Sequence, residues 1–571
     1  FFLRSSPLLL GTSLGAVLGL CAGWTMLAGA RAWPGIMLLA SSVALLHAAL
    51  LPPLQGADET SQIGTIEWLL SDPSPERAWR YPESISLIAR GLEQDRVQYH
   101  VNEPLPVGNP AARARLAALL GSPLPRATTA GLTPPPAADL QVVRLRAPLF
   151  FAPYPALASV LMPLPIVDRI SAYRLVATLW CLLGFGAGLA LLAWGGLPLE
   201  AGLAYGLAFL WPYSVGVAAT CSNYAPAIGT GFLFAAGIVT MIGGASPTRC
   251  RIAGAVALAA AWAGVPVWPD FLALAIVASA LAAALVAWHA LRRATAGAAA
   301  RPALQIGSIA LAGALTTAAA TIAWWNFPWF DARLPGIVGG WHGADLALRA
   351  ALLGAPLLLA ALAAGFYRTL LAAPAAARRR RTIAASAAIA LLLVTMFALT
   401  PYTEVPYERA FLTLPDLVRA HLASFWSNAF SFDQDRLGWK FFFGAFGWHD
   451  TFYPEAIYAA ARWALVLFLI ALPVLGVETA TARPRAAAAL ILVAGIGAAL
   501  AVATLLARHA MTIHPHGRFT LPYLPLVALP VLVLIATPRR RSALRLALRC
   551  GVALNAWTAI AVLGTRYYVQ R

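Results

Sequence analysis

Charged residues are scarce in this chain, and lysine is almost absent. Only 11% of the 571 residues are charged, and Lys440 is the single lysine. About a quarter of the residues in a soluble globular domain are charged, so the composition excludes that class. The 60% content of hydrophobic residues and the mean hydropathy of +0.73 instead indicate a polytopic helical membrane protein.

Cysteine is also rare, and its placement excludes a redox or zinc framework. The five cysteines lie within or beside apolar runs and lack the spacing of a metal or redox site. The net charge of +18 comes almost wholly from arginines in short bridges between apolar runs. This is the positive-inside pattern of membrane proteins, and no soluble basic domain remains for nucleic acid. We therefore expect membrane lipids, and no nucleic acid, as partners.

Long uncharged runs predict the fold class. An all-α integral membrane protein with about 12–14 transmembrane helices is expected, because many runs approach the ~20 residues that a bilayer requires. The predicted spans are 8–30, 33–54, 171–193, 197–217, 222–244, 252–265, 267–291, 303–325, 346–372, 382–400, 456–476, 486–507, 519–537 and 545–563.

Arginine placement predicts the orientation of these spans. Bridges with Arg249/Arg251, Arg292/Arg293/Arg301, Arg378–Arg381, Arg483/Arg485 and Arg539–Arg541 are all assigned to one side, the cytoplasm. The opposite side then carries the long loops. The expected organisation is N-terminal transmembrane helices in 1–54, a first long outer loop with interfacial helices in 55–170, a central transmembrane bundle in 171–400, an aromatic and acidic outer loop in 401–455, and C-terminal transmembrane helices in 456–571.

Two adjacent carboxylates follow the second predicted span. Asp58 and Glu59 emerge almost as soon as the chain reaches water. Such a pair could supply a general base or an acidic ligand for a metal ion at the mouth of a helix bundle. The alternative is structural, because Asp58 precedes a short amphipathic segment, Ile63–Leu70, and is a suitable N-cap.

Three further clusters lie on the same predicted side. Arg146 precedes the aromatic approach Pro148–Pro155, with Arg169 and Arg174 beyond it, and arginine forks suit phosphate oxygens. His516 and Arg518 open a late span, where a helix N-terminus favours an anion. For each, an interfacial snorkelling role is the alternative. In the loop 401–455, aromatic rings among carboxylates are typical of a sugar subsite, although an interfacial aromatic belt has a similar composition. The candidates there are Glu404, Trp426, Trp448, His449 and Asp450.

Four short motifs in this order resemble the GT-C superfamily of membrane glycosyltransferases. They are Pro52-Pro53-Leu-Gln-Gly-Ala-Asp58-Glu59-Thr-Ser-Gln62, Ala147-Pro148-Leu149-Phe150-Phe151, Phe446-Gly447-Trp448 and Gly517-Arg518-Phe519-Thr-Leu-Pro522. The nearest likeness is to a bacterial branch of polytopic proteins with the patterns Pro-Pro…Asp-Glu-x-x-His, Pro-Pro-Leu-Tyr-Tyr, Phe-Gly-Trp and Gly-Arg-Tyr-x-x-Pro. Gln62 replaces the histidine of the first pattern, and the segment Cys221–Pro226 lacks an aspartate that the branch often has.

The resemblance implies an activity and a cellular location. Proteins that look like this transfer a sugar from a polyprenyl-phosphate donor to a glycan, lipid or protein acceptor, with inversion. The site faces outward from the bacterial inner membrane. Asp58 would be the base, Glu59 its partner or a ligand of Mg²⁺ or Mn²⁺, and Arg518, with Arg146 and His516, would hold the donor phosphate.

Two other functions fit the same composition. A lipid-linked saccharide flippase or another transporter would need polar residues along a path within the spans, whereas the charges here lie mainly outside them. A non-catalytic subunit of a cell-envelope glycan assembly machine is the third interpretation.

Overall fold

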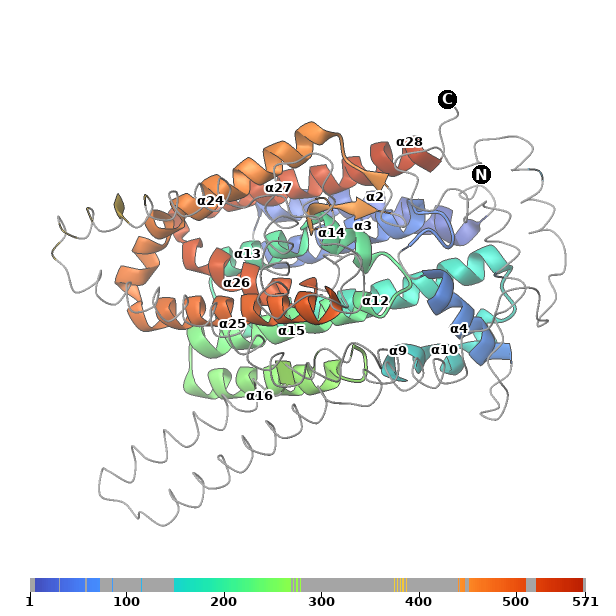
Figure 1. The fold of residues 1–571 in the computed structure, drawn as a ribbon, viewed down its shortest axis with the longest axis horizontal. Coiled ribbons are helices and arrows are strands. Elements are labelled where there is room, and N and C mark those ends of the chain that lie inside the picture. Colours follow the sequence, from blue (N-terminus) through green and yellow to red (C-terminus); the bar gives the residue numbers. More distant parts are fainter. Residues whose placement is uncertain are drawn as a thin grey trace, which may run out of the picture.

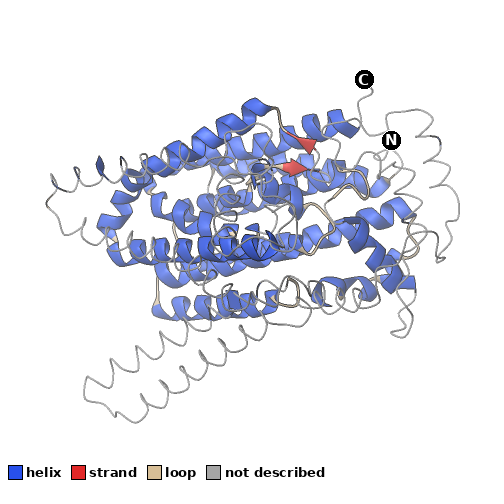
Figure 2. Ribbon diagram, in the orientation of Figure 1, coloured by secondary structure: helices blue, strands red, loops and turns tan. Residues whose placement is uncertain are grey.

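The computed structural model describes residues 6–29, 31–56, 59–71, 148–268, 442–446, 451–509 and 520–567, with isolated residues at 85, 114, 271, 274, 275, 278, 374, 377, 380, 383, 384, 387 and 440. Nearly all of this part of the chain is helical (Figure 2). The exception is a two-stranded antiparallel ribbon of β1 (Ala445–Phe446) and β2 (Thr451–Phe452).

Seven helices of the described part are long and apolar enough to cross a membrane. They are α2 (Pro7–Ala28), α3 (Ala32–Leu50), α12 (Ile166–Trp194), α15 (Tyr224–Gly243), α24 (Glu455–Ala482), α25 (Pro484–His509) and the continuous run Pro538–Tyr567. This run comprises η4 (Pro538–Arg540), α27 (Arg541–Trp557), the π-helical η5 (Thr558–Leu563) and α28 (Gly564–Tyr567). The chain is therefore a multi-pass helical membrane protein, as its composition predicts.

The predicted span 197–217 is broken. It consists of α13 (Leu199–Phe209) and α14 (Pro212–Ala218), bent by 70°. Pro212 explains the break, since proline disfavours a helical backbone at the preceding residue and has no N–H to continue the ladder. Trp211 accordingly has φ −57° and ψ 122°.

Two further helices differ from a simple span. α16 (Pro247–Gly264) begins earlier than predicted, where Ser246 Oγ accepts a hydrogen bond from Arg249 N at 3.3 Å. α26 (Leu524–Ile535) is a shorter apolar helix than the predicted 519–537. The predicted spans 267–291, 303–325, 346–372 and 382–400 lie outside the described residues, apart from a few isolated positions.

The core lies around α3 and α15. In the apolar windows of these helices, 61% and 72% of the residues are buried, against 17% in both α2 and α24. Large apolar side chains such as Leu183 and Leu467 remain exposed on the outer surface of the bundle. In a multi-pass protein such a surface faces the lipid tails, so α2 and α24 form part of the perimeter.

Small residues set the distance between α12 and α15. A Cβ on Gly229 would lie only 2.4 Å from the carbonyl oxygen of Cys181, and one on Gly184 only 2.5 Å from the carbonyl carbon of Gly229. Glycine therefore permits backbone-to-backbone contact, which replaces the hydrophobic driving force that helices lack in lipid.

The bundle has two distinct ends (Figure 1). We call one the arginine end, because it holds the turns with Arg249, Arg483 and Arg539–Arg541. The opposite, loop end holds α4 (Glu59–Ser71) and the short helices α9 (Pro148–Phe151), α10 (Pro153–Ala156) and α11 (Ala158–Leu161). The described arginine bridges thus share one end, as their pattern predicts.

Helix α4 forms where an amphipathic helix is predicted, but it does not lie exposed along an interface. Its residues from Ile63 to Leu69 are all buried. A second stretch with apolar residues at helical spacing, 85–92, lies outside the described residues except for Ile85.

Candidate functional site

The chain between α3 and α4 is folded back sharply. Pro52 and Pro53 end the helical ladder after Leu50. Leu54 then takes a positive φ of 62°, the one non-glycine residue of the described part to do so. Gly56 fits the turn because a Cβ there would lie 2.6 Å from Glu59 Cδ and 2.7 Å from Thr220 Cγ2. The start of α4 is consequently pressed against the chain before α15.

Glu59 is completely buried at the first position of α4 and is paired with Arg174 of α12. Arg174 Nε lies 2.7 Å from Glu59 Oε1, and Arg174 Nη2 lies 2.7 Å from Oε2. This bidentate geometry is the strongest form of a carboxylate–guanidinium contact. The pair joins two elements that are 115 residues apart in sequence.

The remaining donors of Arg174 hold the turn after α3. Nη1 donates to the carbonyl oxygens of Ala48, at 2.9 Å, and Leu51, and Nη2 donates to that of Pro52 at 2.9 Å. Each of the five N–H groups of a guanidinium therefore has an acceptor. Arg174, one of the arginines suited to a phosphate by sequence, has no N–H group left for one.

The Glu59 carboxylate is satisfied as fully as its partner. Besides the two bonds from Arg174, it accepts one from Gly56 N at 2.8 Å and one from Cys221 N at 2.9 Å. Four donors occupy the lone-pair positions of the two oxygens. Glu59 therefore does not fit a metal ligand, and the described residues contain no group of three or more potential ligands. Its geometry is that of a positioning residue.

A second carboxylate on the same face of α4 repeats the arrangement. Glu67 lies 2.5 Å and 3.0 Å from Arg169 Nε and Nη2, and it accepts a hydrogen bond from Tyr173 Oη at 2.8 Å. Residues eight apart share a helix face, so Glu59 and Glu67 together fix α4 along α12. This pairing explains why α4 is buried and does not lie along the membrane surface.

The second motif contacts this ion-pair network. Tyr154 Oη lies 3.7 Å from Cys221 Sγ, and the Tyr154 ring meets Phe150 at 5.8 Å and Tyr173 at 5.6 Å between centroids. Burial raises the pKa of the Tyr154 hydroxyl, and the Cys221 thiol beside it adds to the effect. Burial, followed by the charge of Glu59, likewise raises the pKa of the Cys221 thiol. Both groups stay protonated, so neither is a ready nucleophile.

The residues that follow α16 contact both the second motif and the chain next to the fourth motif. Leu149 N donates to the carbonyl oxygen of Pro266 at 3.2 Å. Two residues later, the Trp268 ring meets that of Tyr523 at 5.5 Å. The carbonyl oxygen of Pro522 packs where a Cβ on Gly231 would be, 2.2 Å away. The described part of Gly517–Pro522 therefore joins the same end of the bundle.

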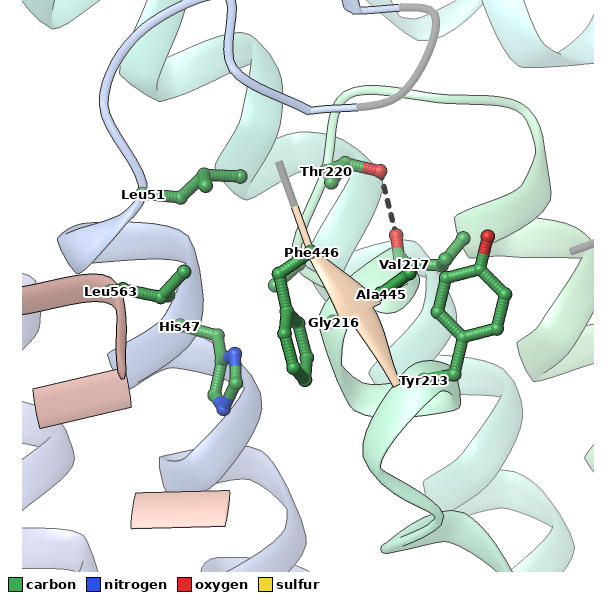
Figure 3. A pocket seen from close by; sticks show the side chains of 10 residues that line it. His47, Leu51, Tyr213, Gly216, Val217, Thr220, Ala445, Phe446 and Leu563 are labelled. Carbon is green, nitrogen blue, oxygen red and sulfur yellow. Dashed lines mark hydrogen bonds between the residues drawn. The ribbon is translucent and has the colours of Figure 1, made fainter. Parts of the chain in front are cut away.

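The third motif contributes Phe446 to a small pocket (Figure 3). Figure 3 shows the Phe446 ring between His47 of α3 and Tyr213 of α14. The Phe446 and His47 ring centroids are 5.9 Å apart. The pocket is small, about 20 Å³, which is room for about one water molecule, and its lining is mostly apolar. Leu51 and Thr220, which line it, belong to the segments held by Arg174 and Glu59.

The ribbon that carries Phe446 is anchored to the C-terminal helices. Tyr453 Oη lies 2.6 Å from Thr558 Oγ1, and Thr451 Oγ1 lies 3.3 Å from Tyr567 Oη. Tyr458 Oη also bonds the Gly444 carbonyl. The two strands bracket residues 447–450, which include the predicted Trp448, His449 and Asp450.

Most of the residues predicted for the site lie outside the described part of the chain. These are Asp58, Arg146, Glu404, Trp426, Trp448, His449, Asp450, His516 and Arg518. Among the residues named from the sequence, Glu59, Arg169 and Arg174 are placed, and each of them is engaged in an ion pair. The roles of Glu67, Tyr173 and Cys221 were not anticipated. The eight-residue spacing of Glu59 and Glu67, facing two arginines at the start of a span, was a usable signal for the pairing.

The arrangement is a rigid polar frame beside an apolar pocket. Residues in or beside the first three motifs meet in it, and Pro522 of the fourth motif packs against α15 at Gly231. Comparisons with models of protein families, with curated proteins and with solved structures found no match.

Proposed function

We propose that this chain is a GT-C-like glycosyltransferase that moves a sugar from a polyprenyl-phosphate donor to a glycan, lipid or protein acceptor. The observation that supports the proposal is that residues in or beside the first three motifs contact one another at the loop end. Glu59 contacts Cys221, Cys221 contacts Tyr154 beside Phe150, and Phe446 shares a pocket with Leu51. Residues so distant in sequence have no reason to converge unless they serve one site or one packing unit.

In the proposed reaction, Asp58 acts as the base. Its carboxylate takes the proton of the acceptor hydroxyl, and the acceptor oxygen attacks the anomeric carbon. The bond between that carbon and the phosphate oxygen breaks, and polyprenyl phosphate leaves with the electron pair. Direct displacement inverts the anomeric carbon. No step is assigned to Mg²⁺ or Mn²⁺, because Glu59 has no lone pair left for one.

The neighbouring carboxylate has a different task. Because Glu59 is tied by four donors, it holds the first turn of α4 and leaves the base role to the preceding residue. Arg518, Arg146 and His516 are proposed to stabilise the departing phosphate. Glu404, Trp426, Trp448, His449 and Asp450 are proposed to bind the sugar or the acceptor.

The test is transfer of radiolabelled sugar from a panel of polyprenyl-phosphate sugars by the purified full chain in liposomes. Asp58→Asn should lower the rate by about 10²- to 10⁴-fold, the usual contribution of general base catalysis. Glu455→Gln is the matched control, because Glu455 is a half-exposed carboxylate paired with Lys440.

Three outcomes separate the alternatives. Transfer at the parent rate by Asp58→Asn would remove Asp58 from the base role. Absence of transfer from every donor, together with measurable movement of a lipid-linked saccharide across the bilayer, would favour a transporter. Absence of both activities would favour a subunit without catalysis.

A further inference from the structure

Helix α27 carries an unusual row of arginines at the arginine end of the bundle. Arg541, Arg545 and Arg549 follow one another at intervals of four residues, so they share one face of the helix. The row runs about 12 Å along the axis, at 1.5 Å per residue. It borders the buried stripe that includes Leu544 and Leu548.

The three arginines differ in their ion-pair and hydrogen-bond partners. Arg541 Nε lies 2.5 Å from Glu200 Oε1, so its charge has a protein partner. Arg545 and Arg549 have no ion pair within the described residues. Their Nε atoms are enclosed, and no acceptor in that part of the chain lies within hydrogen-bonding distance. A buried donor without an acceptor is destabilising, and more so when the group is charged.

The contact between Arg549 and Trp24 indicates the level of Arg549 relative to the membrane surface. Its guanidinium carbon lies 5.1 Å from the ring centroid of Trp24 on α2. Trp24 is four residues before the last residue of α2, Ala28, or about 6 Å inside the helix end. Tryptophan at this level is typical of the membrane–water interface. Arg549 therefore lies near the level of lipid phosphates, not in the hydrocarbon centre.

No carboxylate of the described residues forms an ion pair with Arg545 or Arg549. At the arginine end, Glu200 uses its Oε1 to pair with Arg541 and keeps a buried Oε2 without a hydrogen-bond partner in the described part, and Glu478 lies 3.9 Å from the exposed Arg539. Two guanidinium groups on one helix face, one of them over the Trp24 ring and neither paired with a carboxylate in the described part, match the charge and donors that a phosphodiester requires. Exposed Leu546 and Trp557 on the same helix offer apolar surface for acyl chains.

From this placement we propose that Arg545, Arg549 and Trp24 form a binding site for the headgroup phosphate of an anionic phospholipid in the leaflet at the arginine end. The site is separate from the proposed glycosyl-transfer site at the loop end and does not depend on it.

Native mass spectrometry of the full chain released from nanodiscs tests the site. The discs contain equal amounts of phosphatidylglycerol and phosphatidylcholine. The parent protein should retain phosphatidylglycerol in preference to phosphatidylcholine. Arg545→Gln/Arg549→Gln should retain phosphatidylglycerol roughly 30-fold more weakly, from about fivefold for each arginine near a lipid surface.

Arg251→Gln is the matched control, because Arg251 is exposed at the same end and on another helix. It should retain phosphatidylglycerol like the parent. Equal retention by the double variant and the parent would overturn the proposal, and so would equal retention of the two lipids by the parent.

A second measurement needs no variant at the site. Electron paramagnetic resonance of spin-labelled lipids around the parent protein should show a motionally restricted fraction that is larger for phosphatidylglycerol than for phosphatidylcholine. That excess should persist in 0.5 M salt (roughly a 4–5 Å Debye length), because buried charges are screened less than exposed ones. No excess, or an excess abolished by salt, would refute a built site.

Discussion

Arg174→Met is the most informative perturbation of the ion pair beneath the loop end. Methionine retains much of the unbranched stem of arginine but removes its five donors. The Glu59 carboxylate would keep only the N–H groups of Gly56 and Cys221 as donors. Removing one partner of a buried ion pair costs about 3–5 kcal/mol, because it leaves an uncompensated charge.

This cost can be measured at Cys221, whose N–H donates to Glu59. The Cys221 thiol is buried, so alkylation requires the loop to open. If opening breaks the Glu59–Arg174 pair, Arg174→Met should raise the population of the open loop about 10²- to 4 × 10³-fold. The rate of maleimide labelling at Cys221 should rise by the same factor.

The assay uses a background in which Cys21, Cys181, Cys250 and Cys550 are replaced by serine or alanine. Arg251→Met controls for the loss of an arginine, because Arg251 is exposed at the other end of the bundle. Replacing both partners, as in Glu59→Leu/Arg174→Met, should slow labelling relative to Arg174→Met alone, since no unpaired charge remains. Labelling of Arg174→Met at the parent rate would refute the view that this pair holds the loop.

Three further predictions follow from the packing and the titration of single groups. Gly229→Ala should destabilise the protein by about 1–3 kcal/mol, because the added Cβ would meet the Cys181 carbonyl, whereas Gly15→Ala has open space around it and should not. Thermal unfolding in detergent compares the two variants, and equal midpoints would contradict the close packing of α12 and α15. Tyr453→Phe removes the 2.6 Å bond to Thr558 and should cost about 1 kcal/mol, with a lower midpoint in the same assay; an unchanged midpoint would mean that this bond does not anchor the ribbon. Since burial raises the pKa of the Cys221 thiol, folded protein that retains Cys221 as its single cysteine should resist maleimide from pH 7 to 9, while the same protein after denaturation is labelled increasingly over that interval; rapid labelling of the folded form at pH 8 would show a thiol that is neither buried nor shifted.

The spans were predictable because their signal is local. A bilayer demands about 20 uncharged residues in a row, and that requirement can be evaluated from each stretch alone. The described helices α2, α3, α12, α15, α24 and α25 accordingly lie where the composition predicts them. The clustering of described arginine bridges at one end follows from the same kind of local count. The 70° bend between α13 and α14 was not predicted, although Pro212 was its visible cause.

The partners of the charged groups were decided only by tertiary structure. In sequence, Glu59 stands next to Asp58 as half of an acidic pair, and Arg174 stands among arginines suited to a phosphate. Folding brings Glu59 and Arg174 together across 115 residues and satisfies both within the protein. A buried charge requires a counter-charge, and the packing of the helices determines which residue supplies it. No local sequence pattern specifies that partner. The sequence by itself determined that the chain crosses a membrane many times, and the tertiary structure decided which of its polar residues are engaged in holding it together.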